Sequence, residues 1–184
     1  MQLSIYTRYG GCGKGDSHLV YVKHFCYYTN MDIVSWDNKY DTGIELIDNQ
    51  HKRLVDLTNE LYSACMTGDK HLSDIFRDAM SRMVEYVQHH FNTELEFFNK
   101  VHFPDKHNHI MMHDELIQNI LTAAKDYKEN KKFVPNNFVR TLIDWIFSHI
   151  AVHDKNYALY VKEQIRLGHL TYKQLHEIEA SLKH

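Results

Sequence analysis

Two pairs of metal-capable side chains lie in the middle of the chain, on either side of a proline. His90 and Glu94 are four residues apart, and so are His109 and His113, with Pro104 between the two pairs. Residues four apart lie one turn apart on the same face of an α-helix. Imidazole nitrogens and carboxylate oxygens are suitable ligands for first-row transition metals. Each pair can therefore direct two ligands toward one metal site.

The sequence around these pairs predicts four long amphipathic helices. Apolar residues recur every three or four positions, which is the period of a helix with one buried face. Pro104 breaks the chain between the second and third helices, and the polar stretch KENKKFVPNN separates the third from the fourth. We expect helices over about residues 44–66, 74–100, 105–129 and 136–167, and a short helix over about 172–182.

Long helices joined by short loops favour an all-α fold, an antiparallel up-down-up-down four-helix bundle with an N-terminal arm and a short C-terminal helix. The residues before Met31 show no sustained helical period. We therefore divide the chain into three parts. Residues 1–30 are an N-terminal extension that we expect to be poorly ordered, residues 31–168 are the bundle, and residues 169–184 are a short C-terminal helix or tail.

Further metal-capable residues fall on the predicted buried stripes of the first and fourth helices. His51 lies within the first stripe and His149 within the fourth, where His153 and Asp154 follow it. On a straight helix five residues rotate the side chain by about 140°, so His153 would align with His149 better than Asp154 does. A buried, charged Glu94 also requires a compensating partner.

The motifs IDNQHKRL, HHFNTE, HFPDKHNHIMMH and HIAVHD resemble those of the hemerythrin family, and of its bacteriohemerythrin branch in particular. The resemblance covers residues 33–161, most of the chain after Met31. It implies a cofactor of two non-heme iron ions (Fe2+/Fe3+) with an oxo or hydroxo bridge. The seven ligands that it implies are His51, His90, Glu94, His109, His113, His149 and Asp154.

The resemblance also implies a role for each ligand. One iron takes His109, His113 and His149, the other takes His51 and His90, and Glu94 and Asp154 bridge both. The choice of Asp154 implies a local bend or a π-type turn, and His153 stays as the alternative ligand. Candidates to line an apolar O2 pocket are Trp145, Ile146 and Ile150. We expect the remaining nearby histidines, His89, His102, His107 and His153, to lie at the surface or to support the ligands.

The implied function is reversible O2 binding, for oxygen storage, transport or delivery to oxygen-requiring enzymes. Two alternatives stay open: an oxygen or redox sensor module, and a di-iron enzyme that handles peroxide or nitric oxide. Ferritin-like di-iron proteins carry Glu-x-x-His motifs and zinc proteases carry His-Glu-x-x-His, and the sequence contains neither. We therefore expect a protein that is not an enzyme and has no catalytic residues.

Composition argues against several other classes of protein. A net charge of −3 provides no strong attraction to nucleic acid or to an anionic membrane. Three cysteines without a CxxC motif fit a reducing compartment, and no run reaches the ~18 apolar residues of a membrane span. We expect a cytoplasmic monomer whose ligand is O2, and whose partner is an unidentified oxygen-using enzyme.

Overall fold

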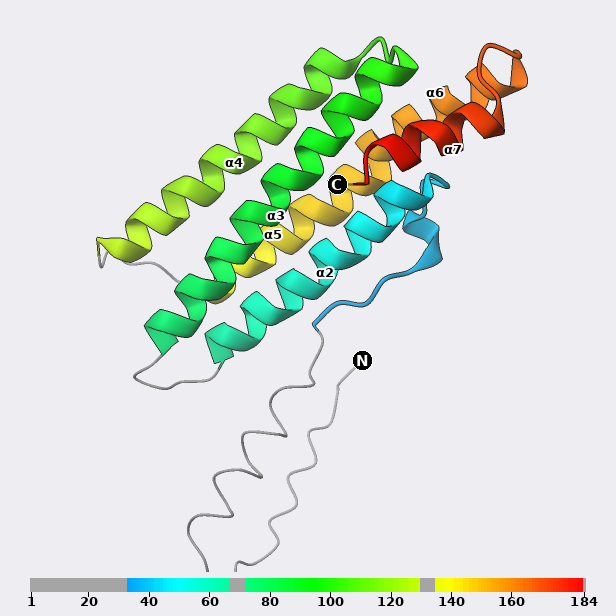
Figure 1. Cartoon of the computed structure of the whole chain (residues 1–184). Helices are drawn as coiled ribbons and strands as arrows, with labels where there is room; N and C mark the ends of the chain where they lie inside the picture. The colour runs from blue at the N-terminus through cyan, green and yellow to red at the C-terminus, as the bar shows by residue number, and fades with distance from the viewer. Residues whose placement is uncertain (1–32, 67–71, 130–134, 184) are drawn as a thin grey trace, which may run out of the picture. The chain divides into compact units, whose positions relative to one another are not determined.

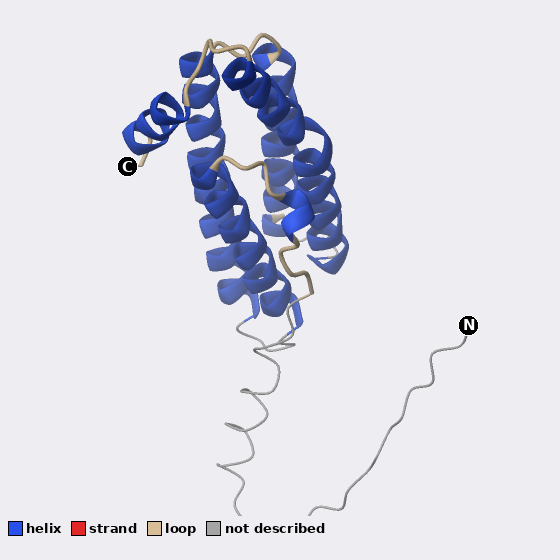
Figure 2. Cartoon of the chain, turned by 90° about the vertical axis from the view of Figure 1, so that its right-hand side faces the viewer, coloured by secondary structure: helices blue, strands red, loops and turns tan. Residues whose placement is uncertain are grey.

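The computed structural model describes residues 33–66, 72–129 and 135–183, in which every regular element is helical (Figure 1, Figure 2). Three long helices are α2 (Glu45–Met66), α3 (Leu72–Val101) and α4 (Lys106–Lys128). A fourth rod consists of α5 (Pro135–His149), the π-helix η2 (Ile150–Asp154) and α6 (Lys155–Arg166). The 3-10 helix η1 (Asn38–Tyr40) precedes these elements, and α7 (Tyr172–Ser181) follows them. Each predicted helix boundary lies within two residues of an observed one.

The long helices form the predicted antiparallel bundle. Helix α3 packs against both α2 and α4, and α2 packs against α5. Figure 1 shows α2, α3, α4 and the α5–α6 rod running alongside one another in alternating directions. Among the described helices, none combines the length and the apolar character that a membrane crossing requires. The extension at residues 1–30 lies outside the described residues, and the three-part division of the chain stays a prediction.

The turn between α3 and α4 reverses the chain in a few residues. Helix α3 ends where His102 adopts a left-handed φ of 55°, and Pro104 cannot continue a helical hydrogen-bond pattern. Phe103 folds back onto α3, because its backbone N–H donates to Phe98 O at 2.9 Å and its ring lies 5.3 Å from the Phe98 ring. The reversal places the start of α4 opposite the end of α3.

The apolar core consists of two clusters at different levels of the bundle. The first cluster includes Leu61, Met83, Ile120 and Leu142, and the second includes Ile47, Phe97, Tyr157 and Leu175. On α2, α3 and the α5–α6 rod, the polar residues His51, Glu94 and Asp154 fall between the two clusters along the chain. The fold therefore seals a buried polar layer with apolar side chains above and below it.

The start of α2 is held from two directions. The Asp48 carboxylate accepts hydrogen bonds from the Thr42 N–H at 2.7 Å and from the Gly43 N–H at 3.0 Å. Glu179 of α7, which is buried, accepts a bond from the Leu46 N–H at 3.0 Å. Gly43 has a φ of +83°, a conformation that favours glycine. These contacts fix the first turn of α2 and thereby the position of His51, which lies one turn beyond Asp48.

Candidate metal centre

Seven buried polar side chains fill the layer between the two apolar clusters, and none is more than 4% exposed. They come from α2, α3, α4, α5 and η2. They meet in one layer because each occupies the inward-facing stripe of its helix. They are His51, His90, Glu94, His109, His113, His149 and Asp154. The structure thus brings together all the residues that the sequence analysis assigns to the metal.

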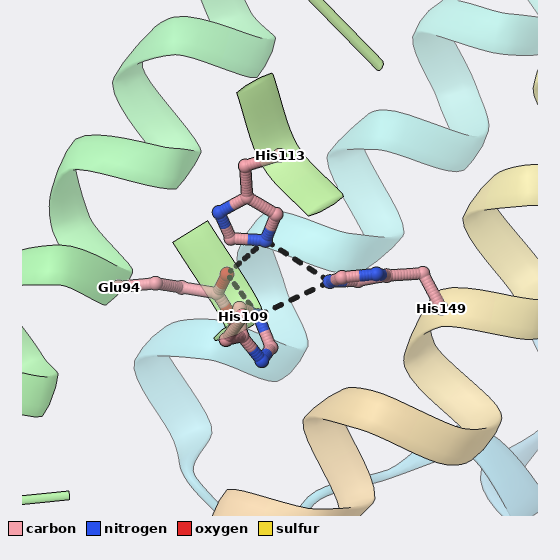
Figure 3. A group of neighbouring side chains, drawn as sticks. All are labelled: Glu94, His109, His113 and His149. Atoms are coloured by element: carbon pink, nitrogen blue, oxygen red, sulfur yellow. Dashed lines mark hydrogen bonds and ion pairs between the residues drawn. The ribbon is translucent and has the colours of Figure 1, made fainter. Parts of the chain in front are cut away.

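A first group joins Glu94 to three histidines from α4 and α5. His113 Nε2 lies 3.2 Å from Glu94 Oε2, and His109 Nε2 lies 3.6 Å from the same oxygen. His149 Nε2 lies 3.0 Å from His113 Nε2 and 3.1 Å from His109 Nε2. Figure 3 shows the three rings and the carboxylate pointing toward one another. Their ligand atoms all lie within 4.8 Å of one another.

A second group consists of His51, His90 and Glu94, whose ligand atoms also lie within 4.8 Å of one another. His90 Nε2 lies 3.8 Å from Glu94 Oε2. His51 Nε2 lies 3.1 Å from Asp154 Oδ2. The edge of the His51 ring meets the His90 ring with centroids 4.9 Å apart. This group therefore offers two imidazoles where the first group offers three.

Glu94 belongs to both groups, and Asp154 contacts histidines of both. Glu94 Oε2 faces imidazoles of α3 and α4 at the distances given above. The two carboxylate oxygens of Asp154 face different histidines. Oδ1 lies 3.2 Å from His149 Nε2 and 3.3 Å from His109 Nε2, whereas Oδ2 faces His51. Each carboxylate can therefore serve two neighbouring cations at once.

Several of these atoms lie close to one another but make no hydrogen bond of suitable geometry among the described residues. They are both ring nitrogens of His51, both carboxylate oxygens of Asp154, and Glu94 Oε2. Burying an ionised carboxylate without a partner is costly, and native proteins pair such groups or bind a metal with them. The donor set therefore fits cations held between the imidazoles and the carboxylates.

The spacing of the nitrogens would allow one cation to contact three imidazoles. Imidazole nitrogens bind first-row metals at about 2.1 Å. His149 Nε2 lies 3.0 Å from His113 Nε2 and 3.1 Å from His109 Nε2, so the three nitrogens are close enough to be ligands of the same ion.

Burial and neighbouring charges shift the pKa values of this layer in different directions. Burial lowers the pKa of His90 to about 3 and also lowers that of His113. Burial opposes the same shift elsewhere, but the nearby carboxylates raise the pKa of His51, which faces Asp154, and that of His109, which faces Glu94. Burial alone would raise the pKa of Glu94, but the neighbouring His90, His109 and His113 hold it well below its usual range. Neutral imidazoles and ionised carboxylates are the forms that coordinate metals.

Two further residues contact the group, and the motifs alone do not identify them. The Tyr157 hydroxyl donates to Glu94 Oε1 at 2.6 Å, and its ring belongs to the second apolar cluster. Gln50 Oε1 lies 3.0 Å from His90 Nδ1. The signal for Gln50 is its place one turn from Leu46 and Leu54, which puts a polar side chain on the buried stripe of α2.

The predicted pocket residues lie beside His149. The Trp145 ring stacks on the His149 ring with centroids 4.4 Å apart and an angle of 12° between the planes. Ile146 and Ile150 are buried in the first apolar cluster. His153 is half-buried, and its ring centroid lies 5.3 Å from that of His149, outside the two groups of ligand atoms. The other predicted surface histidines, His89, His102 and His107, are exposed.

Comparison with known proteins gives one consistent result. The profile of the hemerythrin HHE cation binding domain matches residues 42–160. The bacteriohemerythrin of Methylococcus capsulatus is 27% identical over 129 residues, which cover 70% of this chain and 96% of that protein. The bacteriohemerythrin of Stenotrophomonas maltophilia is 24% identical over 136 residues, covering 73% and 86%. A wild-type hemerythrin crystal structure is 25% identical, with a TM-score of 0.64, and covers 68% of this chain and 95% of its own.

Proposed function

The chain belongs to the hemerythrin family, and from this premise we propose that it binds O2 reversibly at a non-heme di-iron centre, as an oxygen store or carrier. His109, His113 and His149 would hold one iron, and His51 and His90 would hold the other. Glu94 and Asp154 would contact both. Ferrous iron held by these residues would supply the reversible electron transfer that O2 binding requires.

The observation that carries this proposal is the unequal division of the donor set. Three imidazoles face one side of the shared carboxylates, and only two belong to the other group. A cation in the second group would therefore have fewer protein ligands, which leaves room for a small external ligand. O2 is small enough for a layer in which every ligand is almost fully buried.

The charge of the buried layer and the exclusion of water from it favour reversible O2 binding over continued oxidation. The carboxylates of Glu94 and Asp154 offset half of the charge that two ferrous ions would bring into the buried layer. Trp145 stacks on His149, and Ile146 and Ile150 belong to the apolar cluster on that side of the chain. Apolar walls exclude water and polar reductants, whose access would allow side reactions. O2 bound there can therefore be released again as O2.

The test is anaerobic loading of the metal-free protein with ferrous iron, followed by cycles of O2 and argon. We expect about two irons per chain, as in other bundles with this type of ligand set. A visible absorption band should appear with O2 and disappear under argon. Retention of zinc in preference to iron, or bleaching that argon does not reverse, would contradict the proposal.

A pair of histidine variants connects the absorption band to the site. His90→Ala removes a ligand of the two-histidine group, so the band should disappear while the helical circular dichroism signal stays. His107→Ala removes an exposed histidine of α4 and should leave the band unchanged. An unchanged band in His90→Ala would show that the assigned residues do not hold the iron.

A further inference from the structure

Gln50 is a buried amide in contact with a proposed iron ligand. Its side chain is only 6% exposed, and its Oε1 lies 3.0 Å from His90 Nδ1. Its Nε2 donates to Thr93 Oγ1 at 3.2 Å and lies 3.3 Å from His89 Nε2. Gln50 is therefore held by partners on α3, although its backbone is on α2.

The hydrogen-bond network around Gln50 supports one orientation of its amide. The amide Nε2 faces Thr93 Oγ1, and the Thr93 hydroxyl lies 3.0 Å from the His89 backbone carbonyl, to which it can donate its one proton. In this arrangement Thr93 Oγ1 accepts from the Gln50 amide NH2. The Gln50 carbonyl oxygen then faces His90 Nδ1 and can only accept from it.

The orientation of the amide determines the tautomer of His90. In a neutral imidazole one nitrogen carries the proton and the other has a free lone pair. Because Gln50 Oε1 accepts a bond from Nδ1–H, the proton is on Nδ1 and the lone pair is on Nε2. His90 Nε2 is the atom that faces Glu94, at 3.8 Å from Oε2. A turned amide would place a proton on Nε2, where it would block a metal.

The two histidines of the second group, His51 and His90, differ in the hydrogen bonding of their Nδ1 atoms. His51 Nδ1 has no hydrogen-bond partner among the described residues, whereas His90 Nδ1 has Gln50. A hydrogen bond to the outer nitrogen of a metal-binding histidine orients the ring and raises its basicity. His90 is therefore the oriented ligand of this group.

We propose that Gln50, itself held by Thr93, is a positioning residue that locks His90 in the Nδ1–H tautomer and so sets the metal affinity of the two-histidine site. This inference rests on the proposed function for the identity of the metal. The tautomer of His90 can be tested without any metal.

The first experiment measures the tautomer in the metal-free protein. The ring nitrogens of 15N-histidine-labelled protein are observed by long-range proton–nitrogen NMR, and His90→Ala identifies the His90 signals. We expect a proton on Nδ1 of His90 in the wild type and a mixture of tautomers in Gln50→Leu. A proton on Nε2 in the wild type would overturn the inference, whatever metal the protein binds.

The second experiment measures ferrous iron affinity by anaerobic competition with a chelator. In Gln50→Leu the iron of the two-histidine site should bind about 10- to 100-fold less tightly, which is the usual loss when the partner of a metal-binding histidine is removed. Gln50→Glu keeps an oxygen that can accept from Nδ1–H and should restore most of the affinity. Thr93→Val, which removes the partner that holds the Gln50 amide, should lower the affinity for the same iron.

Controls separate failure of this inference from failure of the proposed function. Gln118→Leu changes an exposed glutamine on α4 and should bind iron as the wild type does. If the wild type binds two irons and Gln50→Leu binds both with unchanged affinity, the positioning role is wrong. If the wild type itself binds no iron, the proposed function is wrong, and the NMR measurement still tests the tautomer.

Discussion

His149 and Asp154 are five positions apart in the sequence, yet His149 Nε2 lies 3.2 Å from Asp154 Oδ1. The π-helix η2 makes this contact possible. The Lys155 N–H donates to Ile150 O, the i→i+5 bond of a π-helix. The wider turn brings Asp154 inward, where it is fully buried, and leaves His153 half-buried. The turn predicted by the family resemblance is therefore present.

The π-helix gives a prediction about which of two adjacent residues matters to the metal. Asp154→Ala removes a carboxylate that contacts both ligand groups, so iron affinity should fall by more than the roughly 100-fold that the loss of a supporting residue can cost. His153→Ala should leave the affinity within a few-fold of wild type. Competition with a chelator under anaerobic conditions measures both. The reverse ranking would make His153 the ligand.

The position of Asp154 also shows where reasoning from the sequence stops. Helical periodicity located all four rods, because each has a clear apolar stripe and its breaks fall at proline or polar loops. The same periodicity favours His153 over Asp154, since it assumes a straight α-helix. The expectation of a π-turn comes instead from the family resemblance of the HIAVHD motif.

Gln50 was missed for a related reason. The buried stripe of α2 includes it, but its role depends on the single proton of Thr93, which belongs to another helix. The five buried histidines and Glu94 could be placed on inward-facing stripes from the sequence, because each lies on a regular α-helical stripe. Contacts between helices that support a ligand require the three-dimensional structure.

The bond from Tyr157 to Glu94 should contribute to the stability of the metal-free protein. Tyr157→Phe keeps the buried ring but removes a donor to an ionised carboxylate, and we expect a loss of about 1.5–3 kcal/mol. Tyr160→Phe is a matched control, because the single proton of the Tyr160 hydroxyl has only neutral acceptors, the backbone carbonyls of Val101 and His102. Its expected loss is about 0.5–1.5 kcal/mol.

Urea unfolding of the two metal-free tyrosine variants measures this difference. Equal losses in Tyr157→Phe and Tyr160→Phe would show that the carboxylate bond has no special strength. The raised pKa of Tyr157, which burial and the neighbouring Glu94 cause, keeps its hydroxyl protonated and able to donate throughout the neutral range.

Glu179 of helix α7 should stabilise the bundle through its hydrogen bond to α2. Glu179 accepts a bond from the Leu46 N–H in the first turn of α2, where helices have unpaired N–H groups. Glu179→Ala should lower the free energy of unfolding by about 1–2 kcal/mol, the upper range for loss of a capping side chain. Glu177→Ala, on the exposed side of the same helix, should change it by less than about 0.5 kcal/mol. Equal effects in the two variants would contradict this role.

Cys65 should be a slow nucleophile in the folded protein. Burial raises the pKa of its thiol to about 12, so almost no thiolate is present at neutral pH. In a variant in which Cys12 and Cys26 are replaced by serine, we expect alkylation by iodoacetamide at pH 8 to be at least about 100-fold slower than in the urea-unfolded chain. Mass spectrometry gives both rates. Similar rates would mean that Cys65 is not protected by the fold.

The most direct test of the central claim is the amount of O2 that the iron-loaded protein takes up and gives back. Protein loaded anaerobically with ferrous iron is titrated with O2 and then flushed with argon, while dissolved O2 and bound iron are measured. We predict uptake of about one O2 for every two irons, followed by release of the same amount, as expected for a di-iron bundle. Continued O2 consumption, or uptake without release, would contradict reversible binding.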